Sequence, residues 1–405
     1  MLAPILLVLM VFFVTLPLWV RSVPVQYNAR SLLVRKVTTL VTALGIALVV
    51  FVFAGSLMLR EGINRVLTAA GRADTVVILR KGSDAELSSA IGNEYIGLFR
   101  GPAQVSQAGG VIGEIVIVVT ADRADGFGAS NVLVRGMPPD GFAFRPELKL
   151  ASGRMPRPGT NEAIVGRGIS GRFKGIAPGQ SFELRRNRPL QIVGEFTADG
   201  SSYESEVWGD LDVIRRSLGR EAVVSSVRVR LNRPEDFDAY RQTIENDKRF
   251  SMKVMREADY YQKQSQALST FLGGMGLAAA ILFSLAAMIG AAITMNGAVA
   301  HRTREIGTLR ALGFSRRSIL LSFLTEATVL SLAGGVIGVI AVQLLSLVKV
   351  PIINFQTFSE IVLRFQVAPG VLAWSLWFSG LMGLLGGLFP AIRASRVSPV
   401  EAMRA

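Results

Sequence analysis

The chain has 405 residues, half of them hydrophobic, and its 44 Lys and Arg against 30 Asp and Glu give a net charge of +14. It has no Cys and one His, which excludes structural zinc held by thiolates and a site built from several histidines in one subunit. A mean hydropathy of +0.42 comes from long apolar runs near both ends, so the chain is an integral membrane protein rather than a soluble one.

The first twenty residues are apolar and contain Pro4 and Pro17. They have neither a charged start nor a small-residue cleavage site, which disfavours a cleaved signal peptide. Two interpretations stay open: an extra short span with its N-terminus outside, or a helix lying in the membrane interface. We favour the span.

Four later segments contain apolar runs long enough to cross a bilayer. Clusters of Arg and Lys lie between them, and the positive-inside rule assigns these clusters to the cytoplasm. The resulting order after residues 1–20 is a basic cytoplasmic helix (21–36), core span 1 (37–59), an external domain (60–257), a stalk with core span 2 (258–295), a cytoplasmic helix (296–318), core span 3 (319–348), a short external loop (349–367), core span 4 (368–392) and a cytoplasmic tail (393–405).

About 200 external residues are enough to form a sizeable core. Alternating stretches rich in Val and Ile predict strands, and two segments favour helix, the second with Pro at its start. The strands are expected at 75–79, 111–119, 131–135, 181–184, 190–193 and 222–231, and the helices at 84–91 and 234–246. The predicted fold is an α-helical membrane domain of four core spans plus an extra N-terminal span, with a large α+β domain inserted between the first and second core spans.

Small residues recur at four-residue spacing in the predicted spans, a pattern that lets helix backbones approach closely in lipid. The pattern fits packing within one chain, and for some members it fits an interface between two subunits. The glycines concerned are Gly276, Gly290, Gly334, Gly338, Gly383 and Gly387.

Glu326 is the one acid well inside a predicted span, and such residues are candidates for proton or ion sites. Because Arg316 and Arg317 lie two to three turns earlier, we predict an interfacial ion pair. A carrier driven by protons would need a second acid in another span, which disfavours that function.

The segment between spans 2 and 3 reads RTREIGTLRALGFSRRSIL. It contains helix-forming residues, five Arg and a Glu, and Gly313 is placed to end the helix. A short charged helix joining two spans fits a docking surface for a cytoplasmic partner. The sequence contains no GxxxxGK[ST] motif, so ATP and Mg²⁺ would have to be bound by a second polypeptide.

Several segments resemble the FtsX-like ABC transporter permeases of the MacB and LolC–LolE type (type VII). The segment above continues as LSFLTEATVLSLAGGVIGVI and resembles the coupling helix and third span of that family. GGLFPAIRASRVSPVEAMRA resembles its C-terminal end, YNARSLLVRKVTTLVTALGIALVV its first span, and AIVGRGISGRFKGIAPGQSFELRRNRPLQIVGEF its MacB-like periplasmic core domain.

This resemblance implies a non-catalytic permease subunit that couples a cytoplasmic P-loop ATPase to the periplasm by mechanotransmission. It further implies a homodimer in the inner membrane, driving export or extraction of a hydrophobic, lipid-like or periplasmic substrate, with membrane lipid and a periplasmic adaptor as partners. The residues assigned to ATPase coupling are Arg302, Arg304, Glu305, Gly307, Arg310 and Gly313.

Two other functions are compatible with parts of the sequence. A transmitter that activates a periplasmic partner such as a cell-wall hydrolase would use the same membrane machinery. An ion-coupled carrier would use Glu326. No aromatic residues interleave with the basic clusters, so nucleic acid is not an expected partner.

Overall fold

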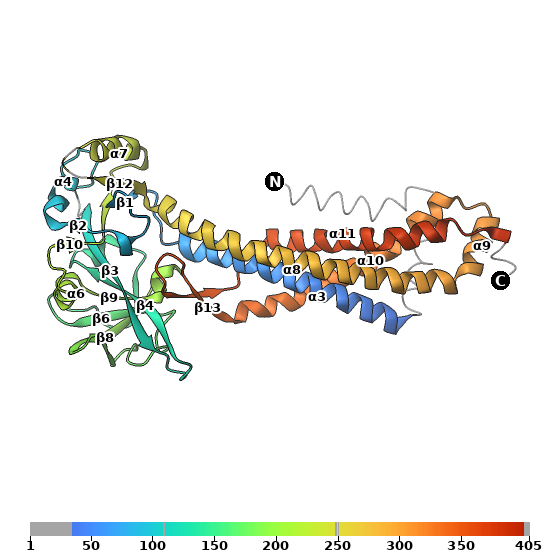
Figure 1. Ribbon diagram of the computed structural model, residues 1–405, viewed down its shortest axis with the longest axis horizontal. Coiled ribbons are helices and arrows are strands. Elements are labelled where there is room, and N and C mark those ends of the chain that lie inside the picture. The colour runs from blue at the N-terminus through green and yellow to red at the C-terminus, as the bar shows by residue number, and fades with distance from the viewer. Residues whose placement is uncertain (1–34, 108–109, 248, 250, 401–405) are drawn as a thin grey trace. The chain divides into compact units, whose positions relative to one another are not determined.

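The computed structural model describes residues 35–107, 110–247, 249 and 251–400 (Figure 1). The predicted extra span at 1–20, most of the basic helix at 21–36 and Arg404 lie outside the described residues. Two compact units are present. Of the described residues, a helical unit contains 35–61, Thr270–Val348 and 364–400, and a strand-rich unit contains Gly62–Ser269 and Lys349–Leu363.

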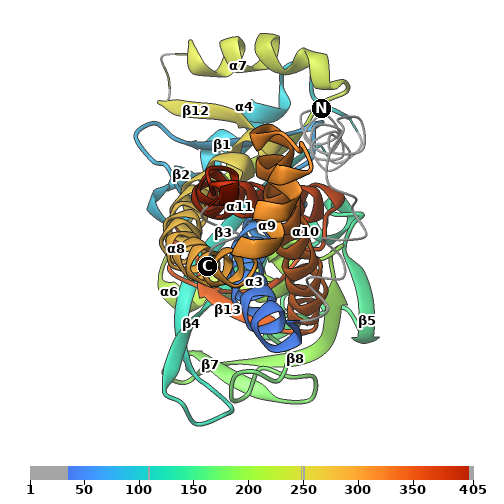
Figure 2. The same cartoon turned by 90° about the vertical axis from the view of Figure 1, so that its right-hand side faces the viewer.

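Four helices are long and apolar enough to cross a membrane. They are α3 (Lys36–Thr68), α8 (Glu257–His301), α10 (Arg316–Val342, extended by η5, Gln343–Leu347) and α11 (Pro369–Ser395). A fifth, short helix, α9 (Thr303–Ala311), joins α8 to α10. Figure 2 looks onto the end of the bundle at which α9 lies. The first span was expected to end at residue 59, whereas α3 continues to Thr68.

Glycines set the spacing of three of these helices. A Cβ on Gly334 would lie 2.6 Å from the Ala43 carbonyl oxygen, and one on Gly338 would lie 2.5 Å from that of Ala47, so α10 meets the α3 backbone directly. On α11, a Cβ on Gly383 would lie 2.9 Å from the Ala327 carbonyl oxygen of α10. These glycines therefore pack helices within one chain.

Two of the predicted glycines, Gly276 and Gly290, lie on α8 and differ from each other. A Cβ on Gly276 would lie 2.2 Å from the Cβ of Ser56 on α3, so this position also packs within the chain. A Cβ on Gly290 would meet nothing within 4 Å. Gly387 resembles Gly276, because its added Cβ would lie 2.4 Å from the Cβ of Ala327.

The strand-rich unit contains one ten-stranded mixed sheet, ordered β12-β1-β11-β3-β4-β9-β6-β8-β5 with β7 paired to β8. The β4–β9 and β6–β8 pairs are parallel and the others antiparallel. Its strands are β1 (Thr75–Arg80), β3 (Val111–Asp122), β4 (Ala129–Met137), β5 (Lys149–Gly153), β6 (Glu162–Gly166), β7 (Ser181–Arg185), β8 (Arg188–Thr197), β9 (Glu206–Asp210), β11 (Ser226–Arg230) and β12 (Met252–Arg256).

Smaller elements complete this unit. They are the pair β2 (Ile91–Gly92) and β10 (Val223–Val224), the hairpin β13 (Lys349–Ile353) and β14 (Glu360–Arg364), the helices α4 (Ile96–Arg100), α5 (Gly141–Phe144), α6 (Leu211–Leu218) and α7 (Phe237–Glu245), and the 3₁₀ turns η1 (Glu86–Ser88), η2 (Asn93–Tyr95), η3 (Ser202–Ser205) and η4 (Pro234–Asp236).

Both faces of the sheet are buried. In β1, Val76 and Ile78 join one apolar core, and Val77 and Leu79 join the other. Successive side chains of a strand point to opposite faces, so an uninterrupted apolar strand indicates a sheet covered on both sides.

Three sequence expectations for this unit are wrong in detail. The helix expected at 84–91 is only the turn η1, because Ser83 and Ser88 side chains bond to nearby backbone carbonyls and compete with a helix. The strand expected at 222–231 is divided at Ser225, whose hydroxyl accepts the Val116 N–H. The external loop expected at 349–367 forms the β13–β14 hairpin and belongs to the strand-rich unit, so that unit is not built only from the segment between the first two spans.

Candidate functional site

The helix α9 is a separate element because the chain breaks from helical geometry on both sides of it. Arg302, between α8 and α9, has φ −108° and ψ 14°. At the other end, Gly313 has φ +95°, the Phe314 N–H donates to the Leu309 carbonyl, and the Gly313 N–H donates to that of Arg310. This pair of bonds is a Schellman motif, which requires the left-handed conformation that glycine adopts without strain.

The underside of α9 is fixed to the ends of three long helices. Ile306 is buried against Val299 of α8, Ile319 and Phe323 of α10, and Ala391 of α11, and Leu309 packs at the edge of this cluster. Gly307 is buried as well. A helix held by one apolar face presents its other face to solvent.

Arg302 was expected on the docking surface, but it is buried, with 7% of the residue exposed. Its Nη1 lies 3.1 Å from Glu326 Oε2, and its Nε lies 3.3 Å from Glu305 Oε2. The guanidinium also lies 5.6 Å from the ring centre of Phe323. Arg302 therefore positions α9 on α10, and it is not available to contact a partner.

The predicted partners of Glu326 were Arg316 and Arg317, and the cation that the structure places beside it is Arg302. Arg316 and Arg317 lie ten and nine residues earlier on the same helix, about 14 Å along the axis. Arg302, which follows the end of α8, can therefore reach Glu326, whereas the two arginines on the same helix as Glu326 cannot.

The exposed face of α9 consists of Arg304, Glu305, Thr308, Ala311 and Leu312. Leu312, the residue directly after α9, is 73% exposed. Arg310 is half-buried, and its Nη1 donates to the Phe314 carbonyl at 3.2 Å, so it supports the turn after α9. The candidate docking surface is thus an apolar side chain bordered by charges of both signs.

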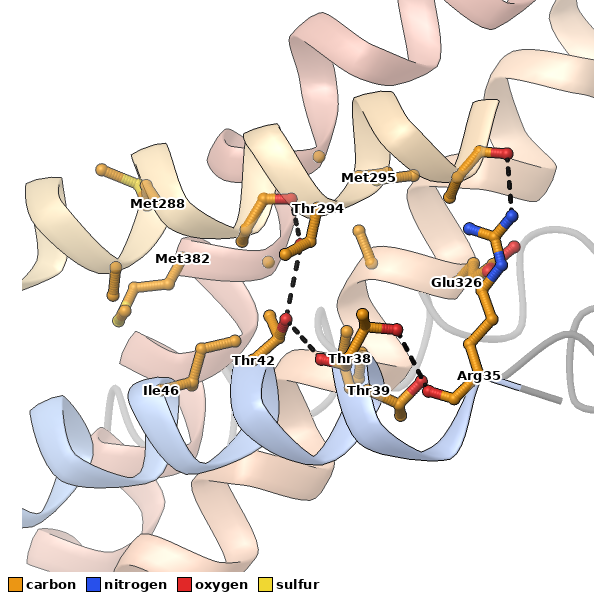
Figure 3. A pocket seen from close by; sticks show the side chains of 17 residues that line it. Arg35, Thr38, Thr39, Thr42, Ile46, Met288, Thr294, Met295, Glu326 and Met382 are labelled. Carbon is orange, nitrogen blue, oxygen red and sulfur yellow. Dashed lines mark hydrogen bonds between the residues drawn. The ribbon is translucent and has the colours of Figure 1, made fainter. Parts of the chain in front are cut away.

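A cavity of about 60 Å³ lies within the helical unit, lined by α3, α8, α10 and α11 (Figure 3). Its polar groups are already bonded within the protein. Thr42 donates to the Thr38 carbonyl at 2.8 Å and lies 3.3 Å from the Thr294 hydroxyl, and Arg35 donates to the Ala298 carbonyl at 3.3 Å. We assign no ligand to this cavity.

A buried ion cluster forms the centre of the strand-rich unit. It contains three arginines and four glutamates, and Arg135 alone lies within 3.1 Å of three carboxylates. Glu257, the first residue of α8, accepts from Arg145 at 2.8 Å and from the Arg72 N–H at 3.2 Å. The cluster members are Glu86, Glu114, Arg135, Arg145, Glu206, Arg228 and Glu257.

Two carboxyl groups of this cluster have pKa values shifted in opposite directions. Burial alone would raise the pKa of Glu114, but Arg228, Arg145 and Arg135 overcome this and lower it to about 2. Burial raises the pKa of Glu206, and its attraction to Arg135 does not offset the effect. Sequence reasoning missed the cluster, because its members are spread over 170 residues and become neighbours only through the sheet.

Family models match two parts of the chain. The MacB-like periplasmic core domain matches residues 39–247, just over half of the chain, and the FtsX-like permease C-terminal domain matches residues 277–399. The chain belongs to the FtsX-like permeases with a MacB-like periplasmic core domain. The resemblance inferred from the sequence is confirmed.

Curated relatives agree with this assignment. The chain is 29% identical over 236 residues to "Macrolide export ATP-binding/permease protein MacB" of Rhodopirellula baltica, covering 56% of this chain and 33% of that protein. It is 36% identical over 153 residues to "Uncharacterized ABC transporter permease YvrN" of Bacillus subtilis, covering 38% of this chain and 34% of that protein. The chain thus spans about a third of the length of these relatives.

The periplasmic region of MacB from Actinobacillus actinomycetemcomitans aligns with 48% of this chain and 94% of its own, at 13% identity and a TM-score of 0.36, which is too low to support an argument. Membership of the family, together with four candidate spans, describes a multi-pass membrane permease with a periplasmic domain. The strand-rich unit is that domain.

Proposed function

We propose that this permease couples ATP hydrolysis, by a separate cytoplasmic ATPase, to a conformational change of its periplasmic domain. The proposal is supported chiefly by α9, a short helix with a buried, ion-paired underside and an exposed face of Arg304, Glu305 and Leu312. A surface that is fixed from below can transmit force applied from above. ATP and Mg²⁺ would be bound by the ATPase.

The path of the force would follow α8. This helix is continuous from Glu257 to His301, and a buried ionic contact lies at each end: Glu257 in the periplasmic ion cluster, and Arg302 directly after the last residue. Displacement of α9 would move α8 as one body, because a helix of 45 residues without proline is stiff along its axis.

Membership of the family also supports a proposal for the substrate class and the assembly. We propose a homodimer in the inner membrane, with a periplasmic adaptor, that exports or extracts a hydrophobic, lipid-like or periplasmic substrate. Gly290 is a candidate contact of the second copy, because a side chain there would meet nothing in its own subunit. Glu326 serves in the ion pair with Arg302, which argues against an ion-coupled carrier.

The proposal is tested by exchanging the two exposed charges of α9. R304E/E305R keeps the net charge of the chain but reverses the local pattern, and like-charge contacts across an interface cost several kcal/mol. E305R also removes the Glu305 contact of Arg302, so E305Q, which loses that contact without reversing the charge, serves as a further control. We expect R304E/E305R to insert and to lose most of its stimulation of the ATPase in reconstituted vesicles, and we expect E305Q to keep it.

The matched control is K174D/D122K, which exchanges an exposed ion pair of the periplasmic domain, with side chains 65% and 67% exposed. This control should stimulate the ATPase like the wild type. Full stimulation by R304E/E305R would show that α9 is not the coupling surface.

A further inference from the structure

A groove of about 770 Å³ lies at the cytoplasmic end of the bundle, between the last turns of α8, the start of α9 and the last turns of α11. On α11 it is lined by Phe389 and Arg393, and Arg396, directly after the last residue of α11, continues the same face. On the opposite side it is lined by Asn296 and Thr303. Among the described residues that line the groove there are two arginines and no acid, so this lining is cationic.

The two arginines of the groove are exposed, and neither side chain has a hydrogen-bond or ion-pair partner among residues 35–400 that are described. The same face of α11 is apolar toward the middle of the membrane, where Phe389 is 69% and Leu385 54% exposed. Along the axis of α11, the apolar side chains come first and the unpaired cations follow, with about 10 Å between Phe389 and Arg396. This order matches that of acyl chains and phosphate in one leaflet of a membrane.

Asn296 adds a second polar feature. Its Oδ1 is buried and has no hydrogen-bond partner within the described part of the chain. A buried acceptor without a donor is costly, and a ligand hydroxyl would satisfy it. The nearby Thr303 hydroxyl does not donate to Asn296 Oδ1, because it donates to the backbone carbonyls of Val299 and Ala300.

We propose that the groove binds one anionic glycerophospholipid of the cytoplasmic leaflet. Arg393 and Arg396 hold its phosphate, Asn296 Oδ1 accepts from a headgroup hydroxyl, and the acyl chains lie against Phe389 and Leu385. This site is separate from the exposed face of α9 and does not depend on the identity of the transported substrate.

The test measures lipid retained by the full chain, purified in mixed micelles containing either phosphatidylglycerol or phosphatidylcholine and analysed by native mass spectrometry. We expect the wild type to retain phosphatidylglycerol in preference to phosphatidylcholine. R393Q/R396Q should weaken that retention about 30-fold, from the loss of two cations at the membrane surface.

The control variant R316Q/R317Q also removes two positive charges, from exposed positions on the same side of the membrane. It should retain phosphatidylglycerol like the wild type. N296L should weaken retention of phosphatidylglycerol but not of phosphatidic acid, which has no headgroup glycerol to donate. Equal retention of phosphatidylglycerol and phosphatidylcholine by the wild type would overturn the proposal. Retention of phosphatidylglycerol by R393Q/R396Q at the level of the wild type would also overturn it. Loss of ATPase binding in that variant, with lipid retention unchanged, would show that the groove contacts a protein instead.

Discussion

The residue that most changes the view of the coupling region is Arg302. In the sequence, Arg302 is the first of five arginines in the segment between spans 2 and 3, and no feature of the sequence distinguishes it from the other four. In the structure it is buried and bonded to Glu326, with Phe323 beneath its guanidinium. The charge of Arg302 therefore fixes the attachment of α9 to α10, whereas Arg304 on the same helix is exposed.

This assignment predicts the behaviour of variants at the pair. R302M removes the guanidinium that pairs with the Glu326 carboxylate, and loss of one member of a buried ion pair typically costs about 3 kcal/mol or more. We expect a lower melting temperature in detergent and reduced ATPase stimulation. R302M/E326L removes both charges and should recover most of the melting temperature, whereas an undiminished loss in the double variant would contradict the pairing.

The periplasmic ion cluster makes a prediction about pH. Glu114 has a pKa of about 2 when folded against a usual value of 4.5, so its stabilising contribution is fully present above pH 4.5 and is lost as the pH falls toward 2. Glu206 acts in the opposite direction, because its raised pKa favours the folded state at low pH. Comparison with E114Q separates the two effects.

We expect E114Q to melt well below the wild type at pH 7, since three arginines lose a shared counter-charge. The difference should shrink as the pH falls from 4.5 toward 2. Calorimetry of the full chain in detergent measures both curves. E183Q, at an exposed position of β7, is the control and should follow the wild type. Parallel curves for E114Q at all pH values would refute the role of its charge.

At the scale of elements, the helices that cross the membrane could be predicted because long apolar runs have few alternative structures. α9 and its ending at Gly313 were also visible in the sequence, through the charged spacing and the glycine. Which side of α9 is buried could not be predicted, because that depends on Val299, Ile319 and Ala391 from three other helices. The hairpin β13–β14 was missed for a similar reason: Glu360 binds Arg123 and Arg172, far away in the sequence.

The glycines make an element-scale prediction. G338L would drive a side chain into the Ala47 carbonyl and Val50 of α3, so we expect it to separate the helices and abolish stable insertion. G290L meets nothing in its own subunit and should leave the monomer folded. If α8 contacts a second copy at this position, G290L will shift the protein from dimer to monomer in light scattering. Failure of G290L to fold would place Gly290 inside the chain's own packing.

At the scale of the whole molecule, the sequence established the class of protein, and the structure changed the reading of its parts. The ion cluster holds Glu257 at the start of α8, and the Arg302–Glu326 pair follows its end. Neither could be read from the chain, because each joins residues that only folding makes neighbours. Together they make α8 the element that connects the proposed coupling surface with the periplasmic domain.

Contact between the exposed face of α9 and the ATPase can be measured directly, because the sequence contains no cysteine. A single cysteine at Leu312, which is 73% exposed, can be cross-linked to the partner ATPase in membranes, with F127C, an 85% exposed periplasmic position, as the control. We expect a cross-linked product from L312C that increases when ATP is bound, and none from F127C. An ATPase that is stimulated normally but forms no product with L312C would contradict this contact.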